Sequence, residues 1–126
     1  MAVALGLTGR FRGRVRARLL WSKQLCTAGN ALHGGTLMAL ADSTGALSAH
    51  LNLPDAATGT VTIESKTNFL RAVTAGHVDA ISRPLHIGRT VIVVETDLVD
   101  EHDRLVARVT QSQLVLTDAR IVLTAR

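Results

Sequence analysis

The segment Thr36–Leu53 constrains the fold of this chain most, because its sequence predicts a long helix that is apolar on nearly every side. One stripe repeats at intervals of three and four residues and consists of Leu37, Leu40, Thr44, Leu47 and Leu51. The opposite side is mostly small or apolar and consists of Met38, Asp42, Gly45, Ala46 and Ala49. A helix that is apolar all round is buried. We therefore expect this helix to lie in the core and to end at Pro54-Asp55.

Most of the chain after Gly59 predicts β-structure. Four segments rich in β-branched residues are the expected strands, Thr60–Leu70, His77–Ile87, Arg89–Val99 and Leu105–Thr117. The last three are joined by short connections, which are typical of antiparallel neighbours. The predicted helix is the only element available to cover the inner face of such a sheet. The expected class is α+β, an antiparallel sheet wrapped around one long buried helix, in a single domain over residues 1–126 with 117–126 as a C-terminal strand extension or tail.

A strict alternation of arginine predicts a further strand. Arginine occupies every even position from Arg10 to Arg18, so a strand would place all five guanidinium groups on one face. This face is either the exposed side of an edge strand, which charge protects from pairing, or an anion site for phosphates. Sites for single-stranded nucleic acid usually interleave stacking aromatic residues. The chain has three aromatic residues, two Phe and one Trp, so we expect no specific nucleic-acid binding.

The remaining composition favours a cytoplasmic protein without membrane contact. Cys26 is the only cysteine, which excludes a disulfide framework and fits a reducing compartment. No stretch approaches the ~20 apolar residues of a membrane span. The first ten residues place apolar before basic side chains, the reverse of a secretory signal. The five histidines lack the HxxxH and HExxH spacings, so no metal is expected.

Asp42 is the residue that most needs an explanation, because it lies in the segment expected to be buried. A buried carboxylate needs a partner or a cavity, so Asp42 is either a structural residue bonded to nearby backbone or part of a site. Gly45 and Ala46 follow one turn later on the same face. Their small size indicates that something approaches the helix closely beside the carboxylate.

His33-Gly34-Gly35 stands at the start of the same helix. First-turn N–H groups have no partner inside a helix, and the helix dipole adds positive charge there. Two glycines allow close approach to those groups, so the segment either serves the geometry of the turn or forms an oxyanion hole. Other machinery is missing from the sequence, which has no G-x-S-x-G, P-loop or GxGxxG motif.

The run Leu32–Asp42, LHGGTLMALAD, resembles the signature of hot-dog-fold acyl-CoA thioesterases. The resemblance is strongest to the PaaI-like branch, which includes phenylacetyl-CoA and 4-hydroxybenzoyl-CoA thioesterases. Later segments follow the family pattern in order, namely Lys66–Val73, Gly76–Val78, His86–Thr90 and Arg104–Ala107. The resemblance implies a hot-dog fold and a hydrolase that splits a CoA thioester, its substrate, into free acid and CoA without a cofactor.

The resemblance also implies roles for individual residues. Asp42 matches the catalytic carboxylate, acting as nucleophile or general base, and Gly34, with His33 holding the loop, matches the backbone donor that polarises the thioester carbonyl. Thr62 falls where the family has a Ser or Thr that positions water. The residues implied in substrate or CoA binding are Gly35, Thr27, Asn30, Gly88, Arg89 and Thr90. The family builds each site from two subunits, which implies a dimer and commonly a homotetramer made of two dimers.

One position departs from the family pattern. Many relatives carry Asn or Gln six residues before the histidine, whereas this chain has Thr27, with Asn30 nearby. The departure bears on substrate choice and rate, and it keeps a second hypothesis open, a non-catalytic protein of the same fold that binds acyl-CoA or regulates. A hot-dog dehydratase is a third hypothesis, although those enzymes pair Asp with His in a different local pattern.

Overall fold

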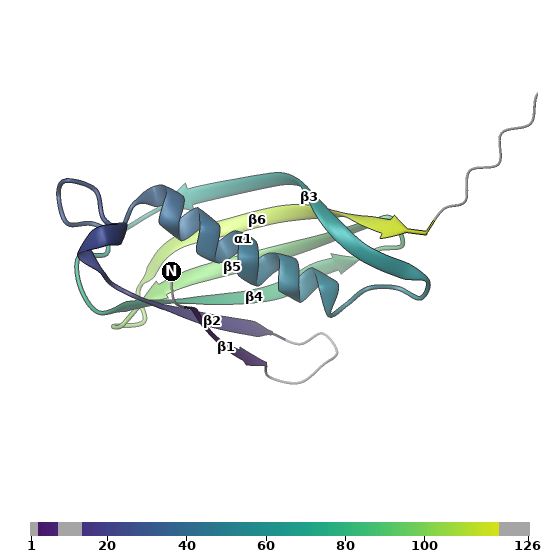
Figure 1. The fold of residues 1–126 in the computed structure, drawn as a ribbon, viewed down its shortest axis with the longest axis horizontal. Coiled ribbons are helices and arrows are strands. Elements are labelled where there is room, and N and C mark those ends of the chain that lie inside the picture. Colours follow the sequence, from purple (N-terminus) through teal and green to yellow (C-terminus); the bar gives the residue numbers. More distant parts are fainter. Residues whose placement is uncertain (1–2, 8–13, 119–126) are drawn as a thin grey trace, which may run out of the picture.

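The structure, a computed structural model, describes residues 3–7 and 14–118. One helix, α1 (Gly34–His50), lies across one face of a curled antiparallel sheet (Figure 1). The described strands are β1 (Val3–Leu7), β2 (Val15–Leu20), β3 (Ala57–Phe69), β4 (His77–Ile87), β5 (Val91–Asp100) and β6 (Leu105–Thr117), and a short 3-10 helix η1 covers Lys23–Leu25. Their order in the sheet is β1-β2-β4-β5-β6-β3, so in the described residues β1 and β3 form the two edges.

This architecture confirms the predicted α+β class and the antiparallel sheet wrapped around one helix. β4 and β6 have the predicted bounds, β3 begins three residues earlier than predicted, and β5 begins at Val91 instead of Arg89. β1 was not predicted; it pairs with β2 from Val3↔Leu19 to Leu7↔Val15. Arg10 and Arg12 of the predicted arginine strand lie outside the described residues. Of the predicted C-terminal extension, residues 117–126, the structure describes only Thr117, which ends β6, and Asp118.

The alternation of arginine along β2 has the predicted consequence. Val15, Ala17 and Leu19 are buried under the helix, whereas Arg16 and Arg18 are exposed on the outer face of the sheet. Side chains alternate between the two faces of a strand, so one face of β2 supplies the core and the other the charge.

The expectation that α1 lies in the core holds for one of its faces. One face is buried against the sheet, but Met38 is 43% exposed, and Asp42 is exposed as well. The physical reason is that a single sheet can cover only one side of a helix that crosses it. The chain therefore presents a second helix face, with Asp42 on it, that this fold leaves uncovered.

A polar layer divides the core beneath α1. One apolar cluster includes Leu37, Leu40 and Val109, and another includes Ala49 and Val115. Between them the inner face of β6 carries two glutamines, Gln111 and Gln113, each 1% exposed, and the helix carries Thr44 and Ser48. Buried amides need hydrogen-bond partners, so we expect polar partners of Gln111 and Gln113 on the neighbouring helix and strands.

Candidate active site

Asp42 is the centre of a hydrogen-bonded group that joins α1, β3 and β6. Thr62 Oγ1 donates to Asp42 Oδ1 at 3.3 Å, and Gln111 Nε2 donates to the same oxygen at 3.1 Å. Gln113 Nε2 donates to Thr62 Oγ1 at 2.6 Å. Within the described part of the chain, no donor reaches Oδ2. One carboxylate oxygen is therefore held by the protein, and the other is left without a donor in the described residues.

Gly45 makes this arrangement possible. A Cβ at position 45 would overlap Gln111 Oε1 and also lie 2.8 Å from Gln111 Cδ. The close approach that the small residues after Asp42 predicted is thus confirmed, and the approaching group is a side chain of β6. With no Cβ at this point, the helix and the amide can be in direct contact.

The start of α1 offers unpaired backbone donors. The His33 carbonyl accepts the N–H groups of Thr36 at 2.9 Å and Leu37 at 3.2 Å. In residues 3–7 and 14–118, no acceptor is found for the N–H groups of Gly34 and Gly35, the first two residues of the helix. Free N–H groups at the positive end of a helix dipole can bind an anion or a developing oxyanion.

His33 holds the loop through its backbone. Its N–H donates to the Leu25 carbonyl at 2.9 Å, and Thr36 Oγ1 donates to the same carbonyl at 3.3 Å. The imidazole makes no capping hydrogen bond and is exposed. The position of Gly34 therefore depends on the main chain around His33, without a contribution from the ring as a cap.

A hollow of about 370 Å³ opens beside Gly34. Its lining is mostly apolar and comprises Ala31, Leu32, Gly34, Leu37, Phe69, Leu70, Arg71 and Ala72. The Phe69 ring lies against the helix start, since a Cβ on Gly34 would be 3.2 Å from Phe69 Cζ. An apolar hollow with free N–H groups at its wall suits a ligand with an apolar body and a polarisable carbonyl.

The carboxylate and the free N–H groups do not meet within one chain. Asp42 lies eight residues after Gly34 on the same helix. At a rise of 1.5 Å per residue, the two positions are separated by about 12 Å along the helix axis. A single carbonyl group cannot contact both of these positions within one chain.

The remaining residues that the resemblance singled out lie in two other places. Thr27 and Asn30 occupy the exposed loop before α1, where the Thr27 N–H donates to the Ala31 carbonyl at 2.8 Å and Asn30 has a φ of 60°. The turn after β4 contains Gly88, Arg89 and Thr90, with the Thr90 carbonyl accepting the Val115 N–H. Val115 packs near Ala49, so this turn lies toward the C-terminal end of α1, away from Gly34.

The outer face of β2 carries its own ion pairs. Arg18 Nε donates to Asp79 Oδ1 at 2.7 Å, and Arg16 Nη2 lies 3.3 Å from Asp79 Oδ2. These hydrogen bonds and charges, the Arg18 hydrogen bond above all, outweigh burial and hold the pKa of Asp79 below its ordinary value. Two arginines of the strip are therefore paired with one aspartate, which offsets one of their two charges and weakens the interpretation of the strip as a phosphate site.

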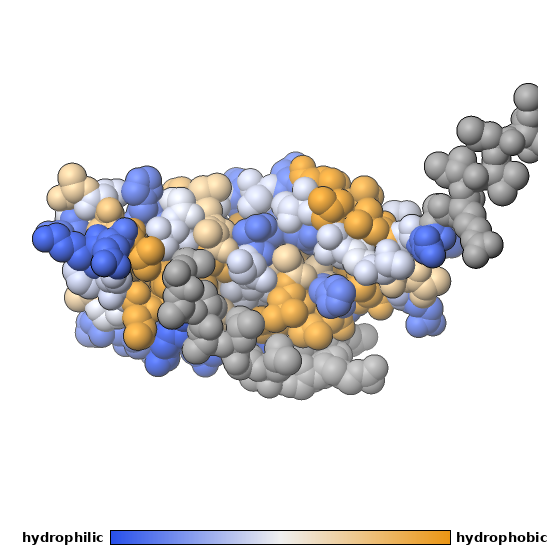
Figure 2. All heavy atoms as spheres, in the orientation of Figure 1, coloured by the Kyte–Doolittle hydropathy of each residue, from blue (hydrophilic) through white to orange (hydrophobic). Residues whose placement is uncertain are grey.

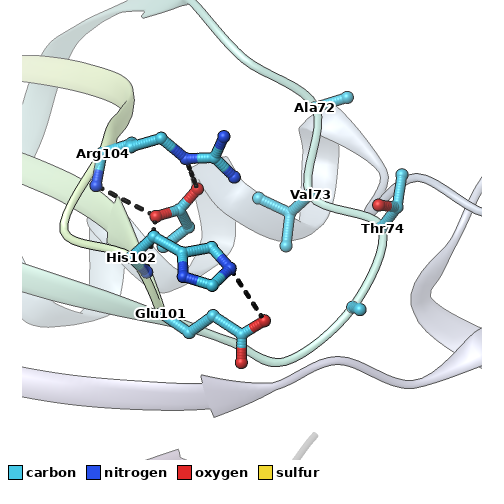
Figure 3. Close-up of a pocket in the computed structure, with 8 residues that line it drawn as sticks. Ala72, Val73, Thr74, Glu101, His102 and Arg104 are labelled. Carbon is cyan, nitrogen blue, oxygen red and sulfur yellow. Dashed lines mark hydrogen bonds and ion pairs between the residues drawn. The ribbon is translucent and has the colours of Figure 1, made fainter.

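A second hollow, of about 170 Å³, lies at the turn between β5 and β6 (Figure 3). Its charged groups are paired with one another. Arg104 Nε donates to Asp100 Oδ2 at 2.8 Å, and His102 Nε2 lies 3.5 Å from Glu101 Oε1. Asp100 Oδ1 also accepts two backbone N–H groups of the turn. Burial raises the pKa of Asp100, but the hydrogen bonds from Arg104 and His102 together bring it below its ordinary value. We assign these groups to the stability of the turn.

Sequence reasoning missed Gln111 and Gln113. The signal was present as Gln-Ser-Gln within a segment otherwise rich in β-branched and apolar residues. Two amides at alternate positions of a strand share one face, and a strand beneath a helix buries that face.

No group of three or more His, Cys, Asp or Glu side chains in the described residues is arranged to hold a metal ion. In the same residues, no helix has the length and apolar character needed to cross a bilayer.

The helix packed against a curled antiparallel sheet defines a class of protein, the hot-dog fold, and this chain carries an acidic residue on its central helix. The sequence model of the thioesterase superfamily matches residues 29–107, a range that contains Gly34, Asp42 and Thr62. This chain belongs to the thioesterase superfamily.

Relatives and solved structures agree with that family. ComA2 of Bacillus subtilis (strain 168), named as a candidate esterase, is 39% identical over 75 residues, which cover 60% of this chain and 60% of ComA2. The match thus spans less than two thirds of that relative. The crystal structure of thioesterase HI1161 from Haemophilus influenzae has a TM-score of 0.81 at 25% identity and covers 90% of this chain and 78% of that one. The structure of a mutant of the phenylacetic acid degradation protein PaaI from Thermus thermophilus has a TM-score of 0.77 at 25% identity, over 89% and 93% of the two chains.

Proposed function

We propose that this protein hydrolyses an acyl-CoA thioester to the free acid and CoA. The observation that carries the proposal is the state of Asp42, whose Oδ1 is held by two donors while Oδ2 is left open. Membership of the thioesterase superfamily supports the reaction class. Asp42 acts as nucleophile or general base, and the Gly34 N–H acts as the oxyanion donor, with Gly35 beside it.

The chemistry needs an activated nucleophile and a polarised carbonyl. As a base, Oδ2 takes a proton from water as the water oxygen attacks the thioester carbon. As a nucleophile, Oδ2 attacks that carbon itself and forms a mixed anhydride, which water then cleaves. In both routes the carbonyl oxygen gains negative charge beside the Gly34 N–H, the C–S bond breaks, and the CoA thiolate takes up a proton.

We further propose that a complete site uses two copies of this chain. The separation of about 12 Å between Asp42 and Gly34 along one helix requires that they serve different carbonyl groups unless a second copy supplies one of them. β3 offers a place for that copy, because it is a 13-residue edge strand with exposed apolar side chains, including Val61 and Ile63. Figure 2 shows hydrophobic side chains gathered over the β3 side of the face that α1 crosses. Long apolar edges readily pair with another chain.

The test is thiol release from short aliphatic, long aliphatic and aryl-acetyl CoA thioesters. We expect turnover of at least one of them, and its loss in Asp42→Asn and Asp42→Ala. Asp55→Asn is the matched control, since Asp55 is an exposed aspartate that follows the helix. Full activity of both Asp42 variants would exclude this mechanism, and binding of acyl-CoA without turnover would favour the non-catalytic alternative.

The two routes differ in where oxygen from water appears. A single turnover in ¹⁸O-labelled water leaves the Asp42 carboxylate unlabelled if Asp42 acts as a base. If a mixed anhydride forms and water attacks its aspartyl carbon, mass spectrometry of the peptide that contains Asp42 detects the label.

Arg89 and Thr90 are proposed CoA contacts, and their alanine variants are expected to raise KM more than they lower kcat.

A further inference from the structure

We propose that Gln111 is a positioning residue for Asp42, and that Gly45 is a glycine so that Gln111 can reach it. The inference rests on the proposed function, because it concerns the same carboxylate. It adds two residues, 45 and 111, to which the sequence resemblance assigned no role. Their relationship follows from geometry: the amide passes through the space that a Cβ on Gly45 would fill.

The amide of Gln111 has one orientation that suits an ionised aspartate. A carboxylate only accepts hydrogen bonds, so Nε2 must face Asp42, and it does so at 3.1 Å. This leaves Gln111 Oε1 buried without a partner in the described part of the chain. A buried polar atom without a partner destabilises the fold. A leucine or methionine would fill the same space without this cost, so the amide is explained by the bond to Asp42 better than by packing.

Gln113 acts on the same oxygen through Thr62. Because Gln113 Nε2 donates to Thr62 Oγ1 at 2.6 Å, the threonine hydroxyl is left to direct its proton elsewhere, and Asp42 Oδ1 lies 3.3 Å away. Both glutamines thus contribute to one result. Oδ1 is fixed from two sides by donors from β6 and β3, and Oδ2 is the oxygen presented for reaction.

The two donors are important because they fix the orientation of the Asp42 carboxylate relative to the helix. Rotation about the Cβ–Cγ bond changes the angle of the carboxylate plane, and each angle points the lone pairs of the second oxygen in a different direction. Two donors on one oxygen select a single orientation before substrate arrives, which reduces the reorganisation needed in the transition state. Hydrogen bonds to a charged group are also among the stronger ones in proteins.

The experiment uses the Gly45–Gln111 pair as a double-mutant cycle in the full chain. Gln111→Met keeps an unbranched side chain and removes the donor, and we expect kcat to fall about tenfold or more while KM changes less than about threefold. Gly45→Ala removes no hydrogen-bonding group, yet its Cβ displaces the Gln111 amide, so we expect a similar loss. Ser112→Ala is the control, because Ser112 lies between the two glutamines in sequence and on the other face of β6.

The combination with Gln111→Ala separates positioning from general disruption. Gln111→Ala by itself should lower kcat as Gln111→Met does. Adding Gly45→Ala to Gln111→Ala should cost no further activity, because the amide that the new Cβ displaces is already absent. Additive losses in this cycle would overturn the proposal, since they would mean that each residue acts on its own.

A second measurement does not depend on activity. In ¹H–¹⁵N NMR spectra, the side-chain amide signals of Gln111 should shift in Asp42→Ala, which removes the acceptor, and should shift less in Ser112→Ala. Unchanged Gln111 signals in Asp42→Ala would overturn the positioning role. If instead the signals shift but the wild-type chain hydrolyses none of the CoA thioesters, the hydrogen bond stands and the proposed function fails.

Discussion

Asp42 and Gly34 lie on one helix, eight residues apart, with the carboxylate at its middle and the free N–H groups at its first turn. In the proposed mechanism, this spacing means that the two groups act on one carbonyl group only across two copies of the chain. The first proposed half-site consists of the helix start and the hollow beside Phe69, and the second consists of the carboxylate with Thr62 and Gln111 around it.

Gly34→Pro should remove the oxyanion donor without breaking the helix. Gly34 is the first helical residue, where proline is tolerated because its missing N–H has no helical partner. His33 already has a φ of −61° and a ψ of 137°, which suit a residue before proline. We expect hydrolysis to fall about 10²–10³-fold, as for the loss of one oxyanion donor. Gly34→Ala, which keeps the N–H and adds a Cβ 3.2 Å from Phe69 Cζ, should lose less.

Mixing two inactive variants should restore activity if each site draws on two copies. Asp42→Ala and Gly34→Pro chains, unfolded and refolded together, form mixed dimers in which one of the two sites has both groups. With random pairing, we expect about a quarter of wild-type activity, because half of the dimers are mixed and half of their sites are intact. The same chains refolded separately and then assayed together before exchange are the control. No recovery in demonstrated mixed dimers would place both groups of a site on one chain.

Ile63→Lys should weaken self-association. Ile63 lies at the irregularity in the β3–β6 pairing between Thr62 and Glu64, and it is 58% exposed. A lysine on an edge strand discourages pairing with another chain, so we expect a lower apparent mass by light scattering and a parallel loss of activity. Leu20→Lys is the matched control, since Leu20 is 64% exposed on β2, far from the β3 edge. An unchanged mass for Ile63→Lys at micromolar concentration would exclude the β3 edge as the contact.

Asp79→Asn should lower the stability of the protein at neutral pH and should make that stability depend less on pH in the acid range. Because the folded-state pKa of Asp79 is lowered, chiefly by the hydrogen bonds from Arg18, its ionised form stabilises the fold. That stability is present above the unfolded-state pKa of about 3.9 and is lost as the pH falls through the lower folded-state value. We expect a loss of roughly 1 kcal/mol at pH 7, because the arginines that hold Asp79 are half exposed.

Urea unfolding at pH 7 and pH 3, at one fixed protein concentration, measures this effect. The difference between wild type and Asp79→Asn should shrink at pH 3, because this lies below the unfolded-state pKa of about 3.9 and the stabilisation from the lowered folded-state pKa is already being lost there. Asp55→Asn is the control, and it should show little difference at either pH. An equal difference at both values of pH would assign the effect to packing instead of charge.

Much of the fold could be predicted because its signals are local. The alternation along residues 14–20 determines which face of β2 is buried. Leu37, Leu40 and Thr44 of the predicted stripe meet the sheet, but so do Gly45 and Ala49 of the side taken as opposite, so the stripe predicted the buried side of α1 only in part. The free N–H groups at Gly34 could also be predicted from the sequence, because the first N–H groups of any helix have no partner inside it. These features depend on neighbours within a few residues.

The surroundings of Asp42 were decided by the tertiary structure. Gln111 is 69 positions away in sequence, and it meets the carboxylate because the β5–β6 and β3–β6 pairings set the register of β6 beneath the helix. A shift of that register by one residue would put Ser112 under the helix and both glutamines on the outer face. The exposure of Asp42 has a similar origin, since one curled sheet covers one side of α1 and leaves the other free. By itself the sequence determined that a carboxylate and a glycine would share a helix, whereas strand register and sheet coverage decided what holds the carboxylate and which side it faces.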